Sequence, residues 1–415
     1  MEPYFSVRDG EMHVEGVPLS DIAVRFGTPV YVYSKAALTE AYRSLDAAFG
    51  AAPHLICYAM KANSNLAILN LFARLGAGFD IVSGGELARV IAAGGDPRKV
   101  VFSGVGKRPA EMREALDAGV LCFNVESESE LDRLDAVAAA AGKIAPMSLR
   151  VNPDVDAGTH PYISTGLKGN KFGVPIEAAL PLYRKAHAMA HIRIVGVDCH
   201  IGSQITEVAP LLEAMEKLLE LADRLAVEGI HLSHIDAGGG LGIRYHRESP
   251  PPVADYIGAF TLAMRGRTES LLIEPGRLLV GNGGVLLTRV EHLKHTPAKN
   301  FAIVDAAMND LLRPALYDAY QDIRPVTSEP STAATYDVVG PVCESADFLG
   351  RERMLAIREG SLLAVMSAGA YGSVMSSNYN SRGRAAEVLV DGETTHLIAR
   401  RESITELFAR ECIVE

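Results

Sequence analysis

The 415-residue sequence has few cysteines and no apolar stretch long enough to cross a membrane, because charges such as Glu274 and Arg277 interrupt the candidates. The cysteines are odd in number, widely scattered, and form no CxxC pair. This pattern indicates neither a disulfide framework nor a cysteine zinc site, and it is typical of a reducing cytosol. The five are Cys57, Cys122, Cys199, Cys343 and Cys412.

Basic residues are also in deficit, with 40 Lys and Arg against 51 Asp and Glu, so the net charge is −11. That sign disfavours general binding to nucleic acid or to an anionic membrane, although it allows a local basic pocket. The first residues, MEPYFSVRDGEMHVEG, lack the basic start and apolar run of a signal peptide. A P-loop is missing too, and no HExxH or HxxxH spacing at His200 supports a metal site. We expect a cytoplasmic protein that binds neither nucleic acid nor membrane.

The composition is 48% hydrophobic and 22% charged, as in globular proteins, and the length predicts two domains. From about Lys35 to Gly281, short apolar runs alternate with helical patterns. This alternation predicts parallel strands joined by crossover helices. Eight such units favour a closed (β/α)8 barrel, with an open doubly wound sheet as the alternative. The expected strands are 54–58, 79–82, 100–103, 121–125, 147–151, 194–199, 232–236 and 271–274, and three of the expected helices are 109–118, 127–140 and 208–227.

After Gly281 the pattern becomes mostly β, so the expected domains are a barrel over 34–280 and a β-rich domain formed by 1–33 and 281–415. Asp391-Gly392 predicts a hairpin turn. Ser403 and Glu406 have the capping-box spacing of a short terminal helix. The expected strands of this domain are 285–291, 301–304, 336–339, 362–365, 387–390 and 396–399.

In a (β/α)8 barrel the active-site residues lie just after the strands, at the carboxyl-terminal mouth. Unusual polar and glycine residues follow this rule, because they stand where the first, fifth, sixth, seventh and eighth expected strands end. In that order they are Lys61, Arg150, His200, Gly238-Gly239-Gly240 and Glu274.

Three of these features carry a chemical interpretation beside a plainer one. Lys61 can form a Schiff base with an aldehyde cofactor, or can simply reach solvent at a strand end. The glycines Gly238 to Gly240 suit a phosphate nest, or a flexible turn. His200 can stack on a planar cofactor, with Ser203 bonding its phosphate, or can be structural.

The run Glu274-Pro-Gly276-Arg277 places an acid and a base beside a tight turn. A carboxylate facing a pyridine nitrogen holds that nitrogen protonated, and an arginine can clamp a carboxylate with two hydrogen bonds. The plainer interpretation is a local ion pair.

In the second domain the notable residues are Arg313 and Tyr317, Cys343 and Glu344, and Tyr371. Cys343 is a candidate proton donor, although an isolated cysteine is usually a small buried apolar residue. Glu344 is a candidate partner for a substrate ammonium, and Tyr371 for a phosphate.

Taken together, these motifs resemble the diaminopimelate decarboxylases, within the alanine-racemase-like fold group of pyridoxal-phosphate enzymes. The similarity runs in family order from residue 58 to residue 372, although several pieces also occur in ornithine and arginine decarboxylases. The matching stretches are YAMKAN, FDIVSGGEL, HIGSQ, AGGGLG, EPGR, NDLLRPALYDAY, CES and GAYG.

The resemblance implies a pyridoxal 5'-phosphate enzyme that converts meso-2,6-diaminopimelate into L-lysine and CO2, the last step of lysine biosynthesis. It implies that Lys61 holds the cofactor covalently, His200 stacks on its ring and Glu274 faces its nitrogen. Ser203, Gly239 and Tyr371 would contact the phosphate. Arg277, Arg313, Tyr317 and Glu344 would hold the substrate, and the enzyme would be a head-to-tail homodimer in which Cys343 and Glu344 enter the partner's site.

Three positions depart from the family pattern: Ala306 and Ala346 replace a usual glycine, and Gly383 replaces a usual proline in Ser-Arg-Gly-Arg384. None removes a functional group. The closest alternative activity is decarboxylation of arginine, ornithine or a carboxylated polyamine by the same fold. A racemase would leave the CES element unexplained, and a cofactor-free regulatory relative would not need Lys61 and Glu274.

Overall fold

The computed structural model describes residues 4–156, 170–328 and 331–415 of the chain. Two compact units form from interleaved segments. One contains Tyr42–Ile243 and Ser249–Leu278, and the other contains Met1–Ala41, Arg244–Glu248 and Leu279–Glu415.

The first unit is a closed barrel of parallel strands. The strands pair in chain order from β5 to β9 and on through β11 and β12 to β13, and β13 pairs with β5 to close the ring. The prediction of a (β/α)8 barrel is confirmed, and the open sheet is excluded. The strands are β5 (His54–Ala59), β6 (Gly78–Ile81), β7 (Val100–Phe102), β8 (Cys122–Val125), β9 (Ala145–Asn152), β11 (Ile192–Asp198), β12 (His234–Asp236) and β13 (Ser270–Ile273), and β10 (Val174–Pro175) adds to β9.

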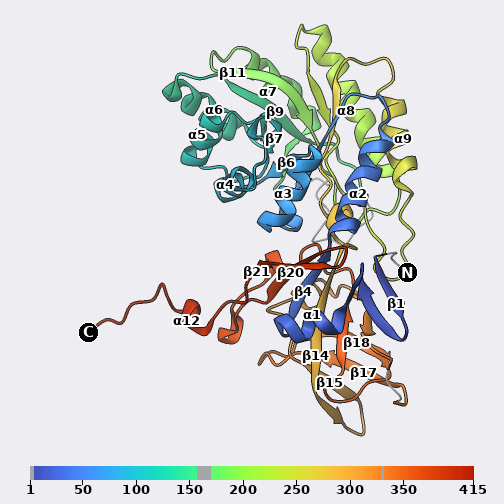
Figure 1. The fold of residues 1–415 in the computed structure, drawn as a ribbon. Helices are drawn as coiled ribbons and strands as arrows, with labels where there is room; N and C mark the ends of the chain where they lie inside the picture. Colours follow the sequence, from blue (N-terminus) through green and yellow to red (C-terminus); the bar gives the residue numbers. More distant parts are fainter. Residues whose placement is uncertain (1–3, 157–169, 329–330) are drawn as a thin grey trace. The chain divides into compact units, whose positions relative to one another are not determined.

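Burial on both faces explains why the barrel strands read as continuous apolar runs. Helices lie around these strands (Figure 1), and each turns an apolar stripe inward. Side-chain caps mark where helices begin: Ser83 Oγ and Ser127 Oγ accept hydrogen bonds from the backbone N–H groups of Glu86 and Glu130. The barrel helices are α3 (Leu66–Leu75), α4 (Gly84–Ala92), α5 (Pro109–Ala118), α6 (Glu128–Ala141), α7 (Ile176–His187), α8 (Ala209–Val227) and α9 (Val253–Ala263), with short turns η1 (Met60–Ala62) and η2 (Pro97–Lys99).

The second unit is mostly β, as predicted, and β14 is its central strand. This strand pairs with β4, β15 and β19, and β4 also pairs with β20. The amino-terminal segment therefore supplies an interior strand of this sheet. The main strands are β4 (Val30–Ser34), β14 (Gly284–His295), β15 (Asn300–Val304), β16 (Ile323–Pro325), β17 (Ala334–Val339), β18 (Phe348–Leu355), β19 (Leu362–Val365), β20 (Ala386–Asp391) and β21 (Thr394–Ala399).

Smaller features of this unit also agree with the sequence. The hairpin between β20 and β21 turns at Gly392, whose φ of 62° suits glycine. Glu406 accepts a hydrogen bond from the Ser403 N–H at the predicted terminal helix. The remaining elements are β1 (Phe5–Arg8), β2 (Glu11–Val14), β3 (Val17–Pro18), α1 (Leu19–Phe26), α2 (Lys35–Ala48), α10 (Arg277–Val280), α11 (Arg313–Tyr317), η3 (Ser373–Met375), η4 (Tyr379–Ser381) and α12 (Ile404–Leu407).

One long strand, β18, has no counterpart among the predicted elements. Its sequence, FLGRERML, carries consecutive charges that hide any alternation. The strand lies at the edge of its sheet, where charged side chains are common because they prevent pairing with other chains.

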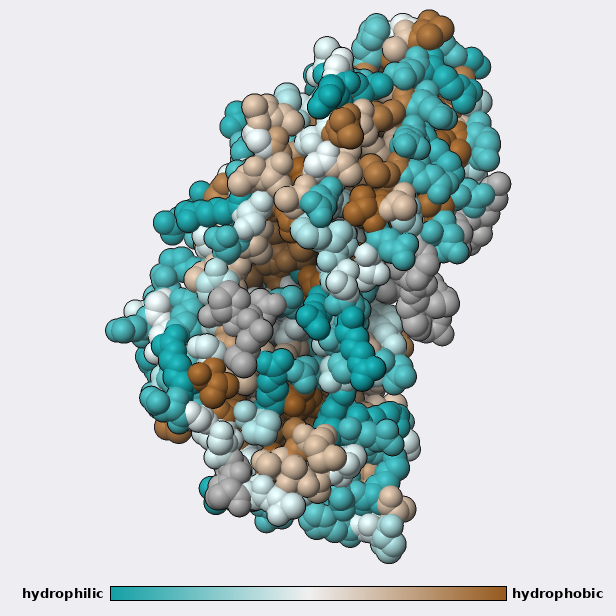
Figure 2. All heavy atoms as spheres, turned by 90° about the vertical axis from the view of Figure 1, so that its right-hand side faces the viewer, coloured by the Kyte–Doolittle hydropathy of each residue, from teal (hydrophilic) through white to brown (hydrophobic). Residues whose placement is uncertain are grey.

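Polar side chains cover much of the face drawn in Figure 2, with apolar groups scattered among them. Among the helices in the described part of the chain, none combines the length and apolar character needed to cross a membrane.

Candidate active site

Lys61 lies in η1, directly after the first barrel strand. Its Nζ atom donates to Asp80 Oδ2 at 2.7 Å, and Asp80 is buried on the neighbouring strand β6. The side chain of Lys61 is 37% exposed, so its amine lies between a buried carboxylate and the barrel mouth. The amine therefore does not simply point into bulk water.

Asp80 is not among the predicted site residues, although it lies inside the stretch FDIVSGGEL. An acid among apolar neighbours on a buried strand was the available signal. Asp80 Oδ1 is buried and makes no hydrogen bond in the described structure, which is costly in an apolar setting.

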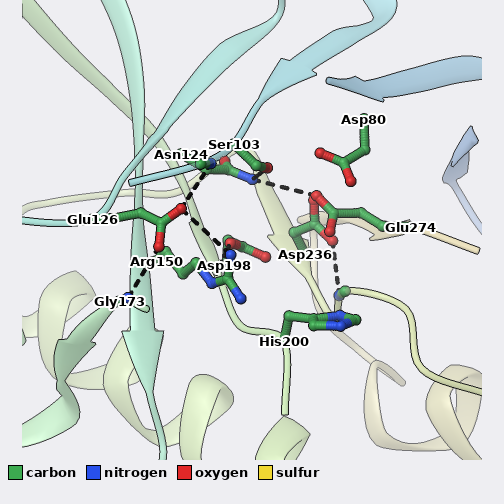
Figure 3. Close-up of polar contacts among 12 residues, drawn as sticks. Asp80, Ser103, Asn124, Glu126, Arg150, Gly173, Asp198, His200, Asp236 and Glu274 are labelled. Carbon is green, nitrogen blue, oxygen red and sulfur yellow. Dashed lines mark hydrogen bonds and ion pairs between the residues drawn. The ribbon is translucent and has the colours of Figure 1, made fainter. Parts of the chain in front are cut away.

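Glu274 follows the last barrel strand, and its carboxylate lies inside the barrel (Figure 3). Asn124 Nδ2 on β8 donates to Glu274 Oε1 at 3.4 Å, and the Glu274 N–H donates to the Gly238 carbonyl at 2.8 Å. Burial raises the pKa of Glu274 well above its usual value, and the charges of Asp80 and Asp236 raise it further.

Glu274 belongs to a buried acidic group with Asp198 and Asp236, in which one carboxylate oxygen of each lies within 4.8 Å of the others (Figure 3). Burial raises the pKa of Asp236 to about 7, with a smaller contribution from the negative charge of Asp80. Like charges this close cannot all be ionised in a buried site. The group therefore holds protons at neutral pH unless a cation faces it.

Arg150 at the end of β9 partly balances this charge. Its Nη1 lies 3.4 Å from Glu126 Oε1, and its Nε lies 3.9 Å from Asp198 Oδ2. Its place at a strand end is visible in the sequence, but no chemical role is predicted for it. It is a buried cation whose described ion pairs are with acids of the barrel interior (Figure 3).

His200 follows β11, and its Nδ1 accepts a hydrogen bond from the Gly239 N–H at 3.2 Å. A ring nitrogen that accepts carries no proton, so the imidazole is neutral with its proton on Nε2. Burial lowers the pKa of His200 well below its usual value, and the charges of Lys61 and Arg150 act in the same direction. A neutral flat ring suits stacking on a positively charged aromatic ring.

The three glycines follow β12 at positions where a larger residue would be strained or would clash with neighbouring backbone. Gly238 and Gly240 have φ values of 66° and 117°. A Cβ atom on Gly239 would lie 2.1 Å from the Glu274 carbonyl oxygen. Gly238 N–H donates to Asp236 Oδ1 at 2.9 Å, so the loop is fixed to the acidic group.

Arg277 begins α10, is buried, and donates from Nη2 to Ser203 Oγ at 3.2 Å. Gly276 precedes it, and a Cβ atom there would lie 3.1 Å from the Ala62 Cβ, beside Lys61. The structure thus brings Ser203, Gly276 and Arg277 to the barrel strand ends that also carry Lys61 and Glu274.

The barrel residues fit a pyridoxal phosphate group. An amine, a neutral imidazole and an excess of buried acid suit an aldehyde on a protonated pyridine ring. The close-packed glycines and the Arg277–Ser203 pair suit an anionic phosphate. Asp80 Oδ1 and Asp236 Oδ2, both buried without a hydrogen-bond partner, indicate that the cluster is completed by a cationic ligand.

The predicted residues of the β-rich unit form a separate set. Arg313 begins α11 and is buried, whereas Tyr317 at its end is partly exposed. Tyr371 has a φ of 54° in the loop after β19. Cys343 and Glu344 lie on an exposed loop, where the Cys343 N–H donates to Asn380 Oδ1 at 2.8 Å. Cys343 is thus not the small buried residue of the plainer interpretation.

The departures from the family pattern at Ala306 and Ala346 are compatible with the local backbone. Neither residue lies in the left-handed region where glycine is favoured. The Ala306 N–H donates to Thr288 Oγ1 at 3.0 Å, so this segment is ordered without glycine.

Comparison with known proteins identifies the family of the chain. Residues 35–281 match the family described as pyridoxal-dependent decarboxylase, pyridoxal binding domain. The diaminopimelate decarboxylase of Pseudomonas aeruginosa is 62% identical over 410 residues, covering 99% of each chain. That of Vibrio cholerae is 57% identical over 413 residues, again covering 99% of each chain.

Solved structures agree in fold over nearly the whole chain. Diaminopimelate decarboxylase from Helicobacter pylori, complexed with L-lysine, has a TM-score of 0.92 and 42% identity, covering 95% of this chain and 99% of that one. The M. jannaschii enzyme in co-complex with L-lysine has a TM-score of 0.95 and 37% identity, covering 99% and 98%. The chain belongs to the diaminopimelate decarboxylase family of pyridoxal-phosphate-dependent decarboxylases.

Proposed function

We propose that this chain decarboxylates meso-2,6-diaminopimelate to L-lysine and CO2, the last step of lysine biosynthesis. The observation that carries the proposal is the amine of Lys61, held on buried Asp80 at the same barrel mouth as Glu274. The family membership and the L-lysine complexes of two structural neighbours support the choice of substrate.

Pyridoxal phosphate, when bound, supplies an aldehyde for the Schiff base and a ring that accepts the electrons left behind by CO2. Lys61 Nζ would hold the cofactor covalently at its aldehyde carbon. Glu274 would keep the ring nitrogen protonated, and neutral His200 would stack on the ring. Around the phosphate we place Ser203, the backbone of Gly238, Gly239 and Gly240, and Gly276, Arg277 and Tyr371.

The substrate would be held by charges of both signs, because its far end carries an ammonium and a carboxylate. Arg277 and Arg313 would bind carboxylate, Glu344 would bind the ammonium, and Tyr317 and Tyr371 would contact the substrate. Cys343 Sγ would deliver a proton to the α-carbon after CO2 leaves.

Selectivity follows from the same charges. Ornithine or arginine offers no carboxylate at its far end, so a desolvated arginine would be left unpaired. That penalty is on the order of several kcal/mol, which favours diaminopimelate over these alternatives and over a carboxylated polyamine bearing only amines at that end.

We further propose a cytoplasmic homodimer in which Cys343 and Glu344 complete the partner's site. Their exposed loop supports this assignment, because in this chain they lie at the surface rather than in a described pocket. All five cysteines are free thiols, in keeping with a reducing compartment. The proposed functional domains are 34–280, and 1–33 with 281–415.

The first test is Lys61→Ala. We expect the variant to lose the visible absorbance of the Schiff base and at least about 1,000-fold of its decarboxylation rate, because no other amine would hold the aldehyde. The matched control is Lys294→Ala at an exposed position of β14, which should keep both. Absorbance spectra and CO2 release are the measurements, and retained turnover in Lys61→Ala would refute the role of this lysine.

A substrate panel tests the reaction itself. The kcat/KM for CO2 release from meso-diaminopimelate should exceed that for ornithine, arginine and a carboxylated polyamine by at least about 100-fold. The reason is that these substrates lack the far-end carboxylate that the buried Arg277 and Arg313 would bind. Preference for one of the other substrates would assign the chain to a related activity. A colourless protein that releases no CO2 would indicate the regulatory alternative.

A further inference from the structure

Arg313 is held by two neutral side chains of the β-rich unit. Its guanidinium carbon lies 4.5 Å from the ring centre of Tyr245. In the Gln321 amide orientation that gives both ends of the amide a partner, Arg313 Nη1 donates to the Gln321 side-chain oxygen at 2.7 Å. Arg313 and Tyr245 are each 7% exposed, and Gln321 is fully buried. The orientation of the guanidinium is therefore fixed by the Tyr245 ring and by the hydrogen bond to Gln321.

Gln321 is itself fixed at both ends. With its amide oriented so that both ends are satisfied, its nitrogen donates to the Met366 carbonyl at 2.6 Å. The Met366 N–H donates to the Asp322 carbonyl at 2.8 Å, and Arg353 Nη2 donates to the Gln321 carbonyl at 3.1 Å. The amide that meets Arg313 thus has little freedom to rotate.

Tyr245 is held by its own loop, Arg244–Glu248. Glu248 Oε2 accepts hydrogen bonds from the N–H groups of Tyr245 and His246, at 3.0 and 2.6 Å. The His246 ring stacks on Tyr320 with ring centres 4.1 Å apart, and Arg353 lies on Tyr320 at 3.8 Å. The loop therefore meets the 313–321 segment at two places, Arg313 and Tyr320.

We propose that Tyr245 and Gln321 are positioning residues that aim Arg313 and thereby set the preference for a substrate with a carboxylate at its far end. The proposal rests on the proposed function, in which Arg313 binds that carboxylate. An aromatic face and an amide oxygen orient a guanidinium without cancelling its charge. A carboxylate at position 321 would instead pair with Arg313 and compete with the substrate.

The decisive variant is Gln321→Glu, which keeps the size of the side chain and adds a charge. The assay measures binding to the holoenzyme of L-lysine, which has a carboxylate beside its ammonium, and of 1,5-diaminopentane, which has none. We expect L-lysine to bind at least about tenfold more weakly and KM for diaminopimelate to rise similarly, with kcat within about twofold. Binding of 1,5-diaminopentane should not weaken. Gln321→Met, which removes the hydrogen bond without adding charge, should lose about threefold for L-lysine.

Tyr245 provides a second pair of variants. Tyr245→Phe keeps the aromatic face and should bind L-lysine as the wild type does. Tyr245→Leu removes the face and should weaken L-lysine binding about three- to tenfold while leaving 1,5-diaminopentane unchanged. Thermal unfolding and the cofactor absorbance of each variant show that it is folded and loaded.

The variant Arg313→Ala distinguishes the proposed role of Arg313 in substrate binding from the positioning roles of Tyr245 and Gln321. If this variant loses L-lysine affinity but Gln321→Glu and Tyr245→Leu stay within about twofold of the wild type, the positioning roles are wrong and the proposed function stands. If Arg313→Ala itself binds L-lysine normally, the proposed role of Arg313 fails, and the inference fails with it.

Discussion

At the scale of single residues, the buried carboxylates of the barrel unit outnumber its buried cations. Asp236 illustrates the consequence: one oxygen accepts the Gly238 N–H, and the other is buried with no hydrogen-bond partner. Burial, together with the negative charge of Asp80, raises the pKa of Asp236 to about 7. The folded protein without cofactor therefore holds a proton on Asp236 that the unfolded chain releases near pH 4. Folding is then opposed increasingly as the pH rises from about 4 to 7.

The first residue-scale prediction is Asp236→Asn. The amide keeps an acceptor for Gly238 and removes the titration, so the cofactor-free variant should gain stability relative to the wild type as the pH rises from 4 to 7. The upper bound of the gain is about 4 kcal/mol, from roughly three pH units at 1.36 kcal/mol each. Denaturant unfolding of both proteins without cofactor, at pH 4 and pH 8, measures the difference.

The same substitution should weaken cofactor binding, because it removes a negative charge that would face a protonated ring. The control is Asp223→Asn, at an exposed position of α8 that pairs with Arg267. It should change neither the pH dependence nor the cofactor affinity. A stability difference for Asp236→Asn that is independent of pH would contradict the buried-proton account.

Much of the candidate site was predictable residue by residue, because the motif residues end barrel strands. Asp80 and Asp198 were missed for a physical reason. An acid within an apolar strand is visible in the sequence, but the sequence does not show which way it points, and only closure of the barrel turns it inward. Gln321 carried no signal either, since its partners Arg313 and Met366 become its neighbours only on folding.

At the scale of elements, the glycine loop after β12 shows how backbone packing limits sequence choice. Gly239 lies so close to the Glu274 carbonyl that a Cβ atom would overlap it. A backbone contact cannot be relieved by turning a flexible side chain, so the loop or β13 would have to move. The loop itself and Glu274, which follows β13, are both proposed to contact the cofactor.

We therefore expect Gly239→Ala to weaken pyridoxal phosphate binding at least about tenfold and to lower stability by roughly 1–3 kcal/mol, as overpacking does. The matched control is Gly258→Ala in α9, where a Cβ atom meets nothing within 4 Å. That change should raise stability by about 0.5–1 kcal/mol, because alanine favours a helix. Cofactor titration and thermal unfolding measure both, and equal behaviour of the two variants would disprove the packing argument.

Element prediction succeeded where one periodicity dominated. All eight barrel strands and the helix α5 (Pro109–Ala118) were placed within a few residues, because buried parallel strands and amphipathic helices have distinct patterns. The edge strand β18 was missed because its charges break the alternation. Edge position is a property of the sheet rather than of the strand.

At the scale of the whole molecule, the proposed dimer makes a prediction that a monomeric enzyme would not satisfy. Lys61→Ala and Cys343→Ala should each be nearly inactive alone. Mixed after reversible dissociation, they should recover roughly a quarter of wild-type activity, because half of the dimers are mixed and each has one intact site.

Activity measured before and after mixing tests this expectation. Wild-type protein carried through the same dissociation is the control for recovery of fold. Absence of recovery in the mixture, with full recovery of the wild type, would place Cys343 in its own chain's site.

The sequence by itself determined the alternation that builds a barrel, the strand ends that carry Lys61, His200 and Glu274, and the family. These are local or periodic properties, so they can be recognised in the sequence without the structure. The tertiary structure alone decided which buried acids meet beneath the barrel mouth, that His200 is neutral, and that Tyr245 and Gln321 hold Arg313. Each of these depends on atoms far apart in the chain coming within a few ångströms, because hydrogen bonds and burial act only over such distances.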